Sequence, residues 1–247
     1  MQILGIIPAR YASTRFPGKP LVDIAGKTMI QRVYEQAAKS KLLSKVIVAT
    51  DDERIVQQVQ SFNGNVAMTR TDHQSGTDRC AELANRFQDI AAVVNIQGDE
   101  PFIDPAQIDL LIMRLMVEGV EIATLVKKME SLEDLLNPNT AKVVLNQNKE
   151  ALYFSRSPIP FLRGVAPKNW LKQATFYQHI GIYGYKKATL LAIAQLPKGQ
   201  LEKLESLEQL RWLEHQYTIS VALTDKATFG IDTPEDLIKA KTFLAAS

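Results

Sequence analysis

Short apolar runs alternate with longer amphipathic stretches over about the first 130 residues. The apolar runs are rich in Val and Ile and lie at 3–7, 45–49, 66–68 and 92–96. The stretches between them carry apolar residues near positions i, i+3 and i+4, which predicts helices at 29–40, 52–62 and 77–87. Continuously apolar strands are typical of parallel sheets that helices cover on both faces. The alternation therefore predicts an α/β fold with a doubly wound, mostly parallel sheet.

The pattern changes after a further apolar run at 122–126. Strand-like runs at 143–145, 151–155 and 177–185 are no longer separated by long helices, and a loop rich in Pro and Gly lies between the last two. We interpret this region, approximately 140–190, as an antiparallel subdomain inserted into a single domain that spans 1–247. The alternation then resumes, with elements predicted at 204–215 (helix), 218–222 (strand) and from Pro234 onward (helix).

Composition and charge narrow the function classes. The chain has 29 basic and 27 acidic residues, so its net charge is +2. Nucleic acid binding relies on clustered Lys and Arg, and this balance of charge gives no sign of a nucleic acid partner. Cys80 is the one cysteine, so the chain holds neither an internal disulfide nor a zinc site built from cysteines. Its apolar runs fall far short of the ~18–20 residues that span a bilayer, and no export signal is evident at its start. We therefore expect a cytoplasmic protein with no membrane partner.

In open α/β sheets, ligands bind beyond the carboxyl ends of the strands. The first apolar run is followed by a long loop with three cations, Arg10, Arg15 and Lys19. These side chains suit a polyphosphate, because Arg gives bidentate contacts and Lys a point charge. The alternative is an ordinary solvated loop. The nearby Gly26-Lys27-Thr28 is not a P-loop, because Leu21 stands where that motif needs a glycine.

Carboxylates follow the apolar run at 92–96, in Gln97-Gly98-Asp99-Glu100-Pro101. Two carboxylates, Asp99 and Glu100, at the end of a parallel strand and kept close to the backbone by Gly98, suit a magnesium ion that holds substrate phosphates. The alternative is that Asp99 caps a helix that begins near Pro105.

A similar arrangement occurs near the C-terminus, in Gly230-Ile231-Asp232-Thr233-Pro234-Glu235-Asp236. Thr233, Pro234 and Asp236 make a good helix start and need no further explanation. Asp232 lies just outside this cap, so a second metal ligand is an available role for it.

Other polar positions support two interpretations each. His73 precedes a predicted helix whose free N–H groups suit an anion or a base carbonyl, but a capped polar loop explains it equally. His179 shares one face of a predicted strand with Gly181 and Tyr183, where a core histidine is the simpler explanation. Three polar residues, Glu205, Glu208 and Gln209, lie on a Leu-rich predicted helix, where such side chains usually form a solvated face.

Several blocks of the sequence, in order, resemble one enzyme family. They are Ile7-Pro8-Ala9-Arg10-Tyr11-Ala12-Ser13-Thr14-Arg15-Phe16-Pro17-Gly18-Lys19-Pro20-Leu21, Ser75-Gly76-Thr77-Asp78-Arg79, Gln97-Gly98-Asp99-Glu100-Pro101, Ala151-Leu152-Tyr153-Phe154-Ser155-Arg156, residues 179–185, Leu207-Glu208-Gln209-Leu210-Arg211 and residues 230–236. The chain resembles the 3-deoxy-manno-octulosonate cytidylyltransferases, or CMP-Kdo synthetases, over nearly its whole length.

The resemblance implies a Rossmann-like nucleotidyltransferase fold whose inserted subdomain serves as a sugar-binding lid or in dimerisation. It implies transfer of CMP from CTP to the anomeric hydroxyl of 3-deoxy-D-manno-octulosonate (Kdo), with release of pyrophosphate, for lipopolysaccharide biosynthesis. Mg²⁺ is the implied cofactor and a homodimer the implied assembly. The alternatives are a cytidylyltransferase for amino-substituted Kdo or sialic acid, and a nucleotide-binding regulator without turnover.

The resemblance also implies roles for individual residues. The family's CTP-binding positions match Arg10, Ser13, Arg15, Lys19, Ser75, Thr77, Arg79 and Gln97. Its metal-binding aspartates match Asp99 and Asp232, and these two with Arg10 and Lys19 form the implied catalytic set. Its sugar-binding positions match Arg156, Arg163, His179, Tyr183, Glu208 and Gln209. The loop at 158–170 is expected to close over the sugar.

Overall fold

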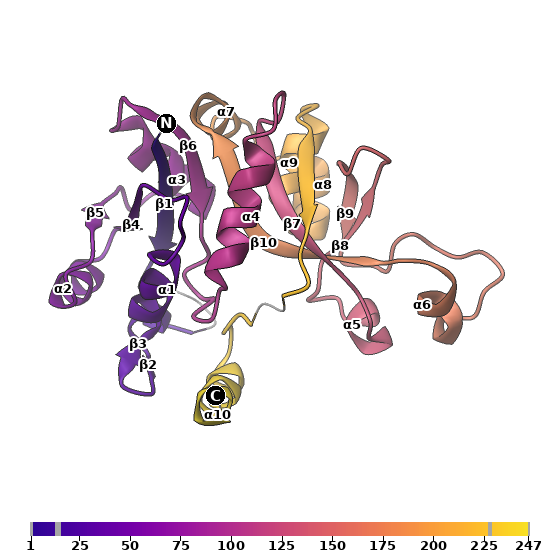
Figure 1. Ribbon diagram of the computed structural model, residues 1–247, viewed down its shortest axis with the longest axis horizontal. Coiled ribbons are helices and arrows are strands. Elements are labelled where there is room, and N and C mark those ends of the chain that lie inside the picture. Colours follow the sequence, from indigo (N-terminus) through magenta and orange to yellow (C-terminus); the bar gives the residue numbers. More distant parts are fainter. Residues whose placement is uncertain (1, 13–15, 227–228, 247) are drawn as a thin grey trace. The chain divides into compact units, whose positions relative to one another are not determined.

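The computed structural model describes residues 2–12, 16–226 and 229–246. The described chain divides into two compact units. The first comprises Met1–Asp109, Lys186–Ala194 and Thr228–Ser247, and the second Leu110–Tyr185 and Gln195–Ala227. Figure 1 shows the elements of both.

The first unit contains parallel strands in the order β6–β1–β4–β5. Their bounds are β1 (Gln2–Ala9), β4 (Lys45–Thr50), β5 (Val66–Met68) and β6 (Ile90–Asn95). The three longer strands are almost wholly buried, as continuously apolar parallel strands should be. All four predicted strands are therefore present, and β5 is the more exposed edge.

Helices connect these strands. The order in which the chain adds strands to the sheet reverses at β1. The helices are α1 (Met29–Ala37), α2 (Glu53–Ser61) and α3 (Gly76–Asn85), with α7 (Lys187–Ile193) packed against α3 and β6. The chain steps outward from β1 to β4 and β5, then returns through α3 to β6 on the other side of β1. Since such crossovers are right-handed, α3 covers the opposite face from α1 and α2. The reversal makes the carboxyl ends of β1 and β6 the expected ligand site.

A short hairpin follows the first loop. It consists of β2 (Asp23–Ile24) and β3 (Lys27–Thr28), joined by Ala25 and Gly26 at φ values of 50° and 81°. Positive φ at both central residues is the conformation of a tight two-residue hairpin turn. Gly26-Lys27-Thr28 is thus a turn and a strand leading into α1, as the exclusion of a P-loop requires.

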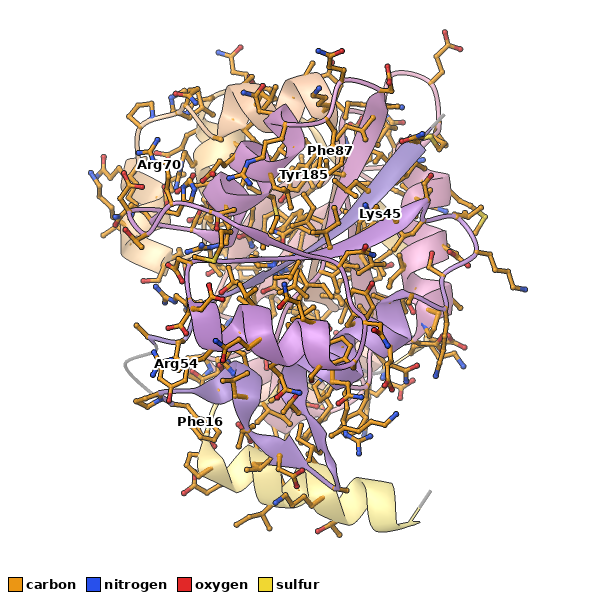
Figure 2. The ribbon with its side chains drawn as sticks, turned by 90° about the vertical axis from the view of Figure 1, so that its left-hand side faces the viewer. Phe16, Lys45, Arg54, Arg70, Phe87 and Tyr185 are labelled. Atoms are coloured by element: carbon orange, nitrogen blue, oxygen red, sulfur yellow. The ribbon has the colours of Figure 1, made fainter. Side chains whose placement is uncertain are left out.

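The C-terminal helix α10 (Pro234–Ala246) belongs to the first unit. It packs over Ile24 and Met29 through Ala240 and Leu237. Phe16 packs against the same cluster and lies beside α10 in Figure 2. This packing carries the end of the chain to the loop that follows β1.

The second unit contains strands β11–β7–β10, with β8 pairing with β9 and with β10. Their bounds are β7 (Ile122–Lys128), β8 (Lys142–Leu145), β9 (Ala151–Ser155), β10 (Tyr177–Lys186) and β11 (Ile219–Leu223). β7 and β11 are parallel, whereas β10 runs antiparallel to β7 and to β8. The antiparallel strands predicted within 140–190 are thus present, and that subdomain boundary stays a prediction.

The helices of the second unit are mostly short. α4 (Pro105–Leu115) carries the chain into the unit, followed by α5 (Leu132–Leu136), α6 (Trp170–Gln173), α8 (Gln200–Glu205) and α9 (Gln209–Glu214). The single helix predicted at 204–215 is wrong. Ser206 adopts φ 51°, which ends α8 and lets α9 begin in a new direction. The sequence pattern also gave no indication of α5, α6 or α7. No described helix has the length and apolar character needed to cross a membrane.

A buried ion pair joins α8 to α9. Arg211 donates from Nε and Nη2 to the two carboxylate oxygens of Glu202, each at 2.7 Å. Both residues are buried, so each charge depends on the other for solvation.

We expect Glu202→Gln to lower the free energy of unfolding by about 3 kcal/mol, because it leaves the Arg211 charge buried without its full counter-charge. Denaturant unfolding of the purified variant measures this. The matched control is Glu35→Gln in the exposed Lys27–Glu35 pair, where the expected loss is below about 1 kcal/mol. Equal losses in the two variants would contradict the argument.

Candidate active site

A pocket of about 270 Å³ lies at the carboxyl ends of β1 and β6. It is lined by Pro8, Ala9, Arg10, Lys19, Pro20, His73, Gln74, Ser75, Gly76, Arg79, Gln97, Gly98, Asp99 and Asp232. All of these residues belong to the first unit. The loop after β1, the start of α3, the loop after β6 and the segment before α10 therefore meet where the chain reversal predicts a ligand.

Lys19 joins the two aspartates of this pocket. Its Nζ donates to Asp99 Oδ2 at 2.7 Å and to Asp232 Oδ1 at 3.1 Å. The Lys19 side chain is 16% exposed, and those of Asp99 and Asp232 are 29% and 50% exposed. Two carboxylates thus converge on one cation at the mouth of a polar pocket.

Backbone contacts bring the two aspartates together. The backbone N–H of Ile231 donates to the carbonyl of Asp99 at 2.9 Å. Gly98 lies so close to β1 that a Cβ there would meet the carbonyl oxygen of Pro8 at 2.9 Å. The loop after β6 therefore needs glycine to pass β1 and deliver Asp99 beside Lys19.

The interpretation of Asp99 as a helix cap is wrong. Asp104 Oδ1 accepts from the backbone N–H of Ala106 at 2.9 Å at the start of α4. The carboxylate of Asp99 faces Lys19 instead.

The interpretation of the C-terminal motif is confirmed. Thr233 Oγ1 accepts from the backbone N–H of Asp236, and the Asp236 carboxylate accepts from the backbone N–H of Thr233. This reciprocal pair begins α10 and leaves the side chain of Asp232 facing the pocket.

The predicted CTP-binding residues divide into several groups. Arg10, Lys19, Ser75 and Gln97 line the pocket, and Arg10 is exposed. Thr77 is buried in α3 and is not among the lining residues. Ser13 and Arg15 lie outside the described residues.

Arg79 lines the pocket, yet its guanidinium is anchored behind it. It donates to Asp51 Oδ2 at 2.8 Å and to the hydroxyl oxygen of Thr69. Arg79 is 4% exposed. We did not single out Asp51 from the sequence, although it follows the apolar run at 45–49 and the rule applied to the other strands points to it.

The start of α3 is held by polar contacts. Ser75 Oγ accepts from the backbone N–H of Asp78, and the Asp78 carboxylate accepts from the backbone N–H of Ser75. His73 contacts Glu82 through Nε2. Burial opposes ionisation of Glu82, but bonds from Arg70, His73 and Arg86 outweigh it and lower its pKa to about 2. Both interpretations of His73 are compatible with this position, in a capped loop and on the pocket wall.

Glu100 differs from its neighbour Asp99. Burial, together with the nearby charge of Asp99, raises the pKa of Glu100 to about 8. Glu100 is therefore neutral at pH 7, and the negative charge at the pocket comes from Asp99 and Asp232.

His179, Tyr183 and Thr124 form a second polar cluster, in the second unit. The rings of His179 and Tyr183 lie 5.2 Å apart between centroids. Thr124 Oγ1 lies 3.1 Å from His179 Nε2 and donates to the carbonyl of Ile182 at 2.8 Å. With the Thr124 hydroxyl proton directed to a backbone carbonyl, Oγ1 can accept from Nε2 of the tautomer that carries its proton there, and in that tautomer Nδ1 is an acceptor. Burial lowers the pKa of His179 to about 3, so the ring is neutral at physiological pH.

Glu208 and Gln209 lie at the start of α9, near this cluster. Burial, together with the charge of Glu208, raises the pKa of Tyr183 well above its usual value. Glu208 Oε1 lies 3.7 Å from Arg211 Nη2. Gln209 is buried, and among the described residues its Nε2 has no hydrogen-bond partner. The helix that carries these residues is therefore not a simple solvated face.

The two predicted sugar-binding arginines are placed differently from this cluster. The Arg156 guanidinium donates to the backbone carbonyls of Glu205, Ser206 and Pro138. Arg163 is exposed on the loop that precedes α6. That loop packs Leu162 and Val165 against a small core around Trp170. Sugar contact by Arg156 or Arg163 stays a prediction.

The chain is similar to known proteins over its whole length. A model of the family described as "Cytidylyltransferase" matches residues 4–219. The 3-deoxy-manno-octulosonate cytidylyltransferase of Parabacteroides distasonis is 55% identical over 99% of both chains. That of Thermodesulfovibrio yellowstonii is 49% identical over 99% of this chain and 98% of the relative.

Solved structures agree. A CMP:2-keto-3-deoxy-manno-octonic acid synthetase complexed with CTP matches with a TM-score of 0.92 and 42% identity, over 100% of this chain and 99% of the other. This match confirms the α/β fold with a mixed, mostly parallel sheet. A 4-diphosphocytidyl-2C-methyl-D-erythritol synthase from Anaerococcus prevotii shares the fold at a TM-score of 0.65 and 14% identity, over 99% and 96% of the two chains. With these matches beside the site geometry, the chain belongs to the 3-deoxy-manno-octulosonate cytidylyltransferase family.

Proposed function

We propose that this chain transfers CMP from CTP to the anomeric hydroxyl of Kdo and releases pyrophosphate. The observation that carries the proposal is the convergence of Lys19, Asp99 and Asp232 in the pocket beyond β1 and β6. The relatives' names supply the two substrates, and the solved relative complexed with CTP supports the nucleotide. The sequence blocks shared with the family include both aspartates and the lysine.

The pocket fits a magnesium ion. Mg²⁺ commonly binds to proteins through one or two carboxylates and completes its shell with waters and substrate phosphates. Asp99 and Asp232 already share one cation, the Lys19 ammonium. No group of three or more His, Cys, Asp or Glu suited to a metal occurs among the described residues, so a site here relies on substrate oxygens. When bound, the ion supplies Lewis-acid polarisation of the α-phosphate.

The chain's own cations act on the triphosphate. The anomeric hydroxyl attacks the α-phosphorus and loses its proton to water, a new P–O bond forms, and the bond to the bridging oxygen of the leaving pyrophosphate breaks. Arg10 and Lys19 offset the negative charge that develops on that oxygen. Catalysis then consists of alignment and charge placement, with no covalent enzyme intermediate.

The second unit provides directional polar groups for an acidic sugar. In the tautomer that donates from Nε2 to Thr124, His179 offers an acceptor at Nδ1. Gln209 offers its amide as a donor, and Glu208 a carboxylate as an acceptor. Such groups suit the hydroxyls of a sugar. Binding of the sugar by Arg156 and Arg163, closure of the 158–170 loop, the homodimer and the cytoplasmic location remain predictions from the family resemblance.

The test of the function is pyrophosphate release by the purified protein with magnesium, each of the four NTPs, and Kdo beside amino-substituted Kdo and sialic acid. We expect release with CTP and Kdo. Release with CTP and another of these sugars instead would move the error to the sugar-binding residues. CTP binding without release for any pair would favour the nucleotide-binding regulator.

We expect Asp99→Asn to lower kcat by about 10²-fold or more, since it removes one charge preorganised at the reacting phosphate. Steady-state pyrophosphate release measures the effect. Asp104→Asn is a matched control, because Asp104 caps α4 and does not face Lys19. Near-wild-type turnover of Asp99→Asn would exclude Asp99 from the metal site.

We expect His179→Ala to raise the KM for Kdo and to leave CTP binding intact. The His179 side chain contacts Thr124 and Tyr183, whereas the residues that line the nucleotide pocket belong to the first unit. Steady-state kinetics gives the KM, and calorimetry gives the Kd for CTP. Weakened CTP binding with an unchanged KM for Kdo would contradict a role of His179 in sugar binding.

A further inference from the structure

Glu205 ends α8 and binds the strand β9. Its Oε1 accepts from the hydroxyl of Ser155 at 2.7 Å, and its Oε2 accepts from the backbone N–H of Arg156 at 2.9 Å. Both oxygens of one carboxylate are thus occupied by donors from the last residue of β9 and the residue after it. A carboxylate on a solvated helix surface would not need two such hydrogen bonds from another element.

Arg156 returns the contact from the other side. Its Nε donates to the carbonyl of Glu205 at 2.7 Å, and its Nη2 donates to the carbonyl of Ser206 at 3.2 Å. These carbonyls lie at the C-terminal end of α8, where backbone acceptors lack partners within the helix and where a cation is favoured. Glu205 and Arg156 therefore close a reciprocal clamp between β9 and the end of α8.

Lys142 holds the strand side of this clamp. It is fully buried, and its Nζ donates to the carbonyls of Arg156, Asn137 and Thr140. An ammonium has three protons, so these three acceptors satisfy it completely. The backbone of Arg156 is consequently fixed to the core of the second unit.

The clamp lies beside the turn that leads into α9. Ser206 has φ 51°, and the chain leaves α8 there through a tight turn of three residues, 206–208, before α9 begins at Gln209. Glu208 and Gln209 are the proposed sugar-binding groups. Glu208 lies in this turn and Gln209 directly after it. A shift of the turn would therefore move both side chains.

We propose that Glu205 is a positioning residue, which sets Glu208 and Gln209 for the acidic sugar by clamping the α8–α9 turn to β9. The inference rests on the proposed function, because it assigns the turn a role in sugar recognition. It also gives Arg156 a role through the same turn, in addition to any contact with sugar.

The test is a comparison of Glu205→Ala, Glu205→Gln and Glu214→Ala. Glu214 is the matched control, since its Oε1 also accepts from α8, at the backbone N–H groups of Gln200 and Leu201, but within the described part of the chain it accepts no hydrogen bond from β9. Glu205→Gln is the conservative variant, because its amide can still accept from the Arg156 N–H and donate to the Ser155 oxygen.

We expect Glu205→Ala to raise the KM for Kdo about tenfold, since small misplacement of substrate-positioning groups is costly. The kcat at saturating Kdo and the Kd for CTP should change less than about threefold, as should every parameter of Glu205→Gln and Glu214→Ala. Thermal unfolding and CTP calorimetry show whether each variant is folded. If Glu205→Ala does not fold, Ser155→Ala removes one donor to Glu205 and should raise the KM for Kdo about threefold.

Two results would overturn the inference alone. One is an unchanged KM for Kdo in Glu205→Ala and Ser155→Ala, while the wild-type protein is active with CTP and Kdo. The other is an equal rise in KM in Glu205→Ala and Glu214→Ala, which would indicate loss of α8 stability and no effect specific to the turn. Absence of pyrophosphate release by the wild-type protein with CTP and Kdo would instead overturn the proposed function, and the inference with it.

Discussion

The contact of Lys19 with Asp99 and Asp232 is the interaction on which the candidate active site depends. Two carboxylates held close together repel each other, and a cation between them turns that repulsion into attraction. Asp99 and Asp232 lie 80 and 213 positions after Lys19 in the chain. Their contact with Lys19 therefore requires the first unit to be folded. The segment after β1 supplies Lys19, the loop after β6 supplies Asp99, and the segment before α10 supplies Asp232.

The topology explains why these segments meet. The order of the strands reverses at β1, so the connections on the two sides of β1 diverge. This leaves the carboxyl ends of β1 and β6 open to a ligand. Gly98 permits close passage of the loop after β6, and the Ile231–Asp99 backbone bond brings in the segment before α10. Neutralisation of Glu100 by burial leaves the pocket with the two aspartates as its negative charges. A polyanionic nucleotide and a small hard cation need this combination of cationic loop and paired carboxylates.

Much of this could be predicted from the sequence, and the failures have physical causes. Periodicity predicted the four strands of the first unit, because fully buried parallel strands carry a strong signal. It predicted one helix at 204–215, whereas two helices lie there. The interruption is at Ser206, which adopts a left-handed backbone conformation, and a serine does not signal a helix end in the sequence as Gly or Pro does. The rule that ligand-site residues follow the strands located Asp99, and the same rule points to Asp51, which we did not single out. Glu205, judged by helical spacing alone, looked like a solvated charge, because its partners on β9 lie 49 and 50 positions away.

The arginines show most clearly what a shared motif does and does not establish. Arg79, Arg156 and Arg211 all lie in blocks that resemble the family, and ligand contact is the first interpretation for a cation near an anionic substrate. In the structure their guanidinium groups bond to Asp51, to backbone carbonyls and to Glu202, respectively. A planar group with five donors can join several chain segments at once, which a lysine cannot do. The fold thus uses these arginines to hold the segments that carry Ser75, Glu208 and Gln209. Arg10 and Lys19, from the segment after β1, line the pocket in which we propose that the nucleotide binds.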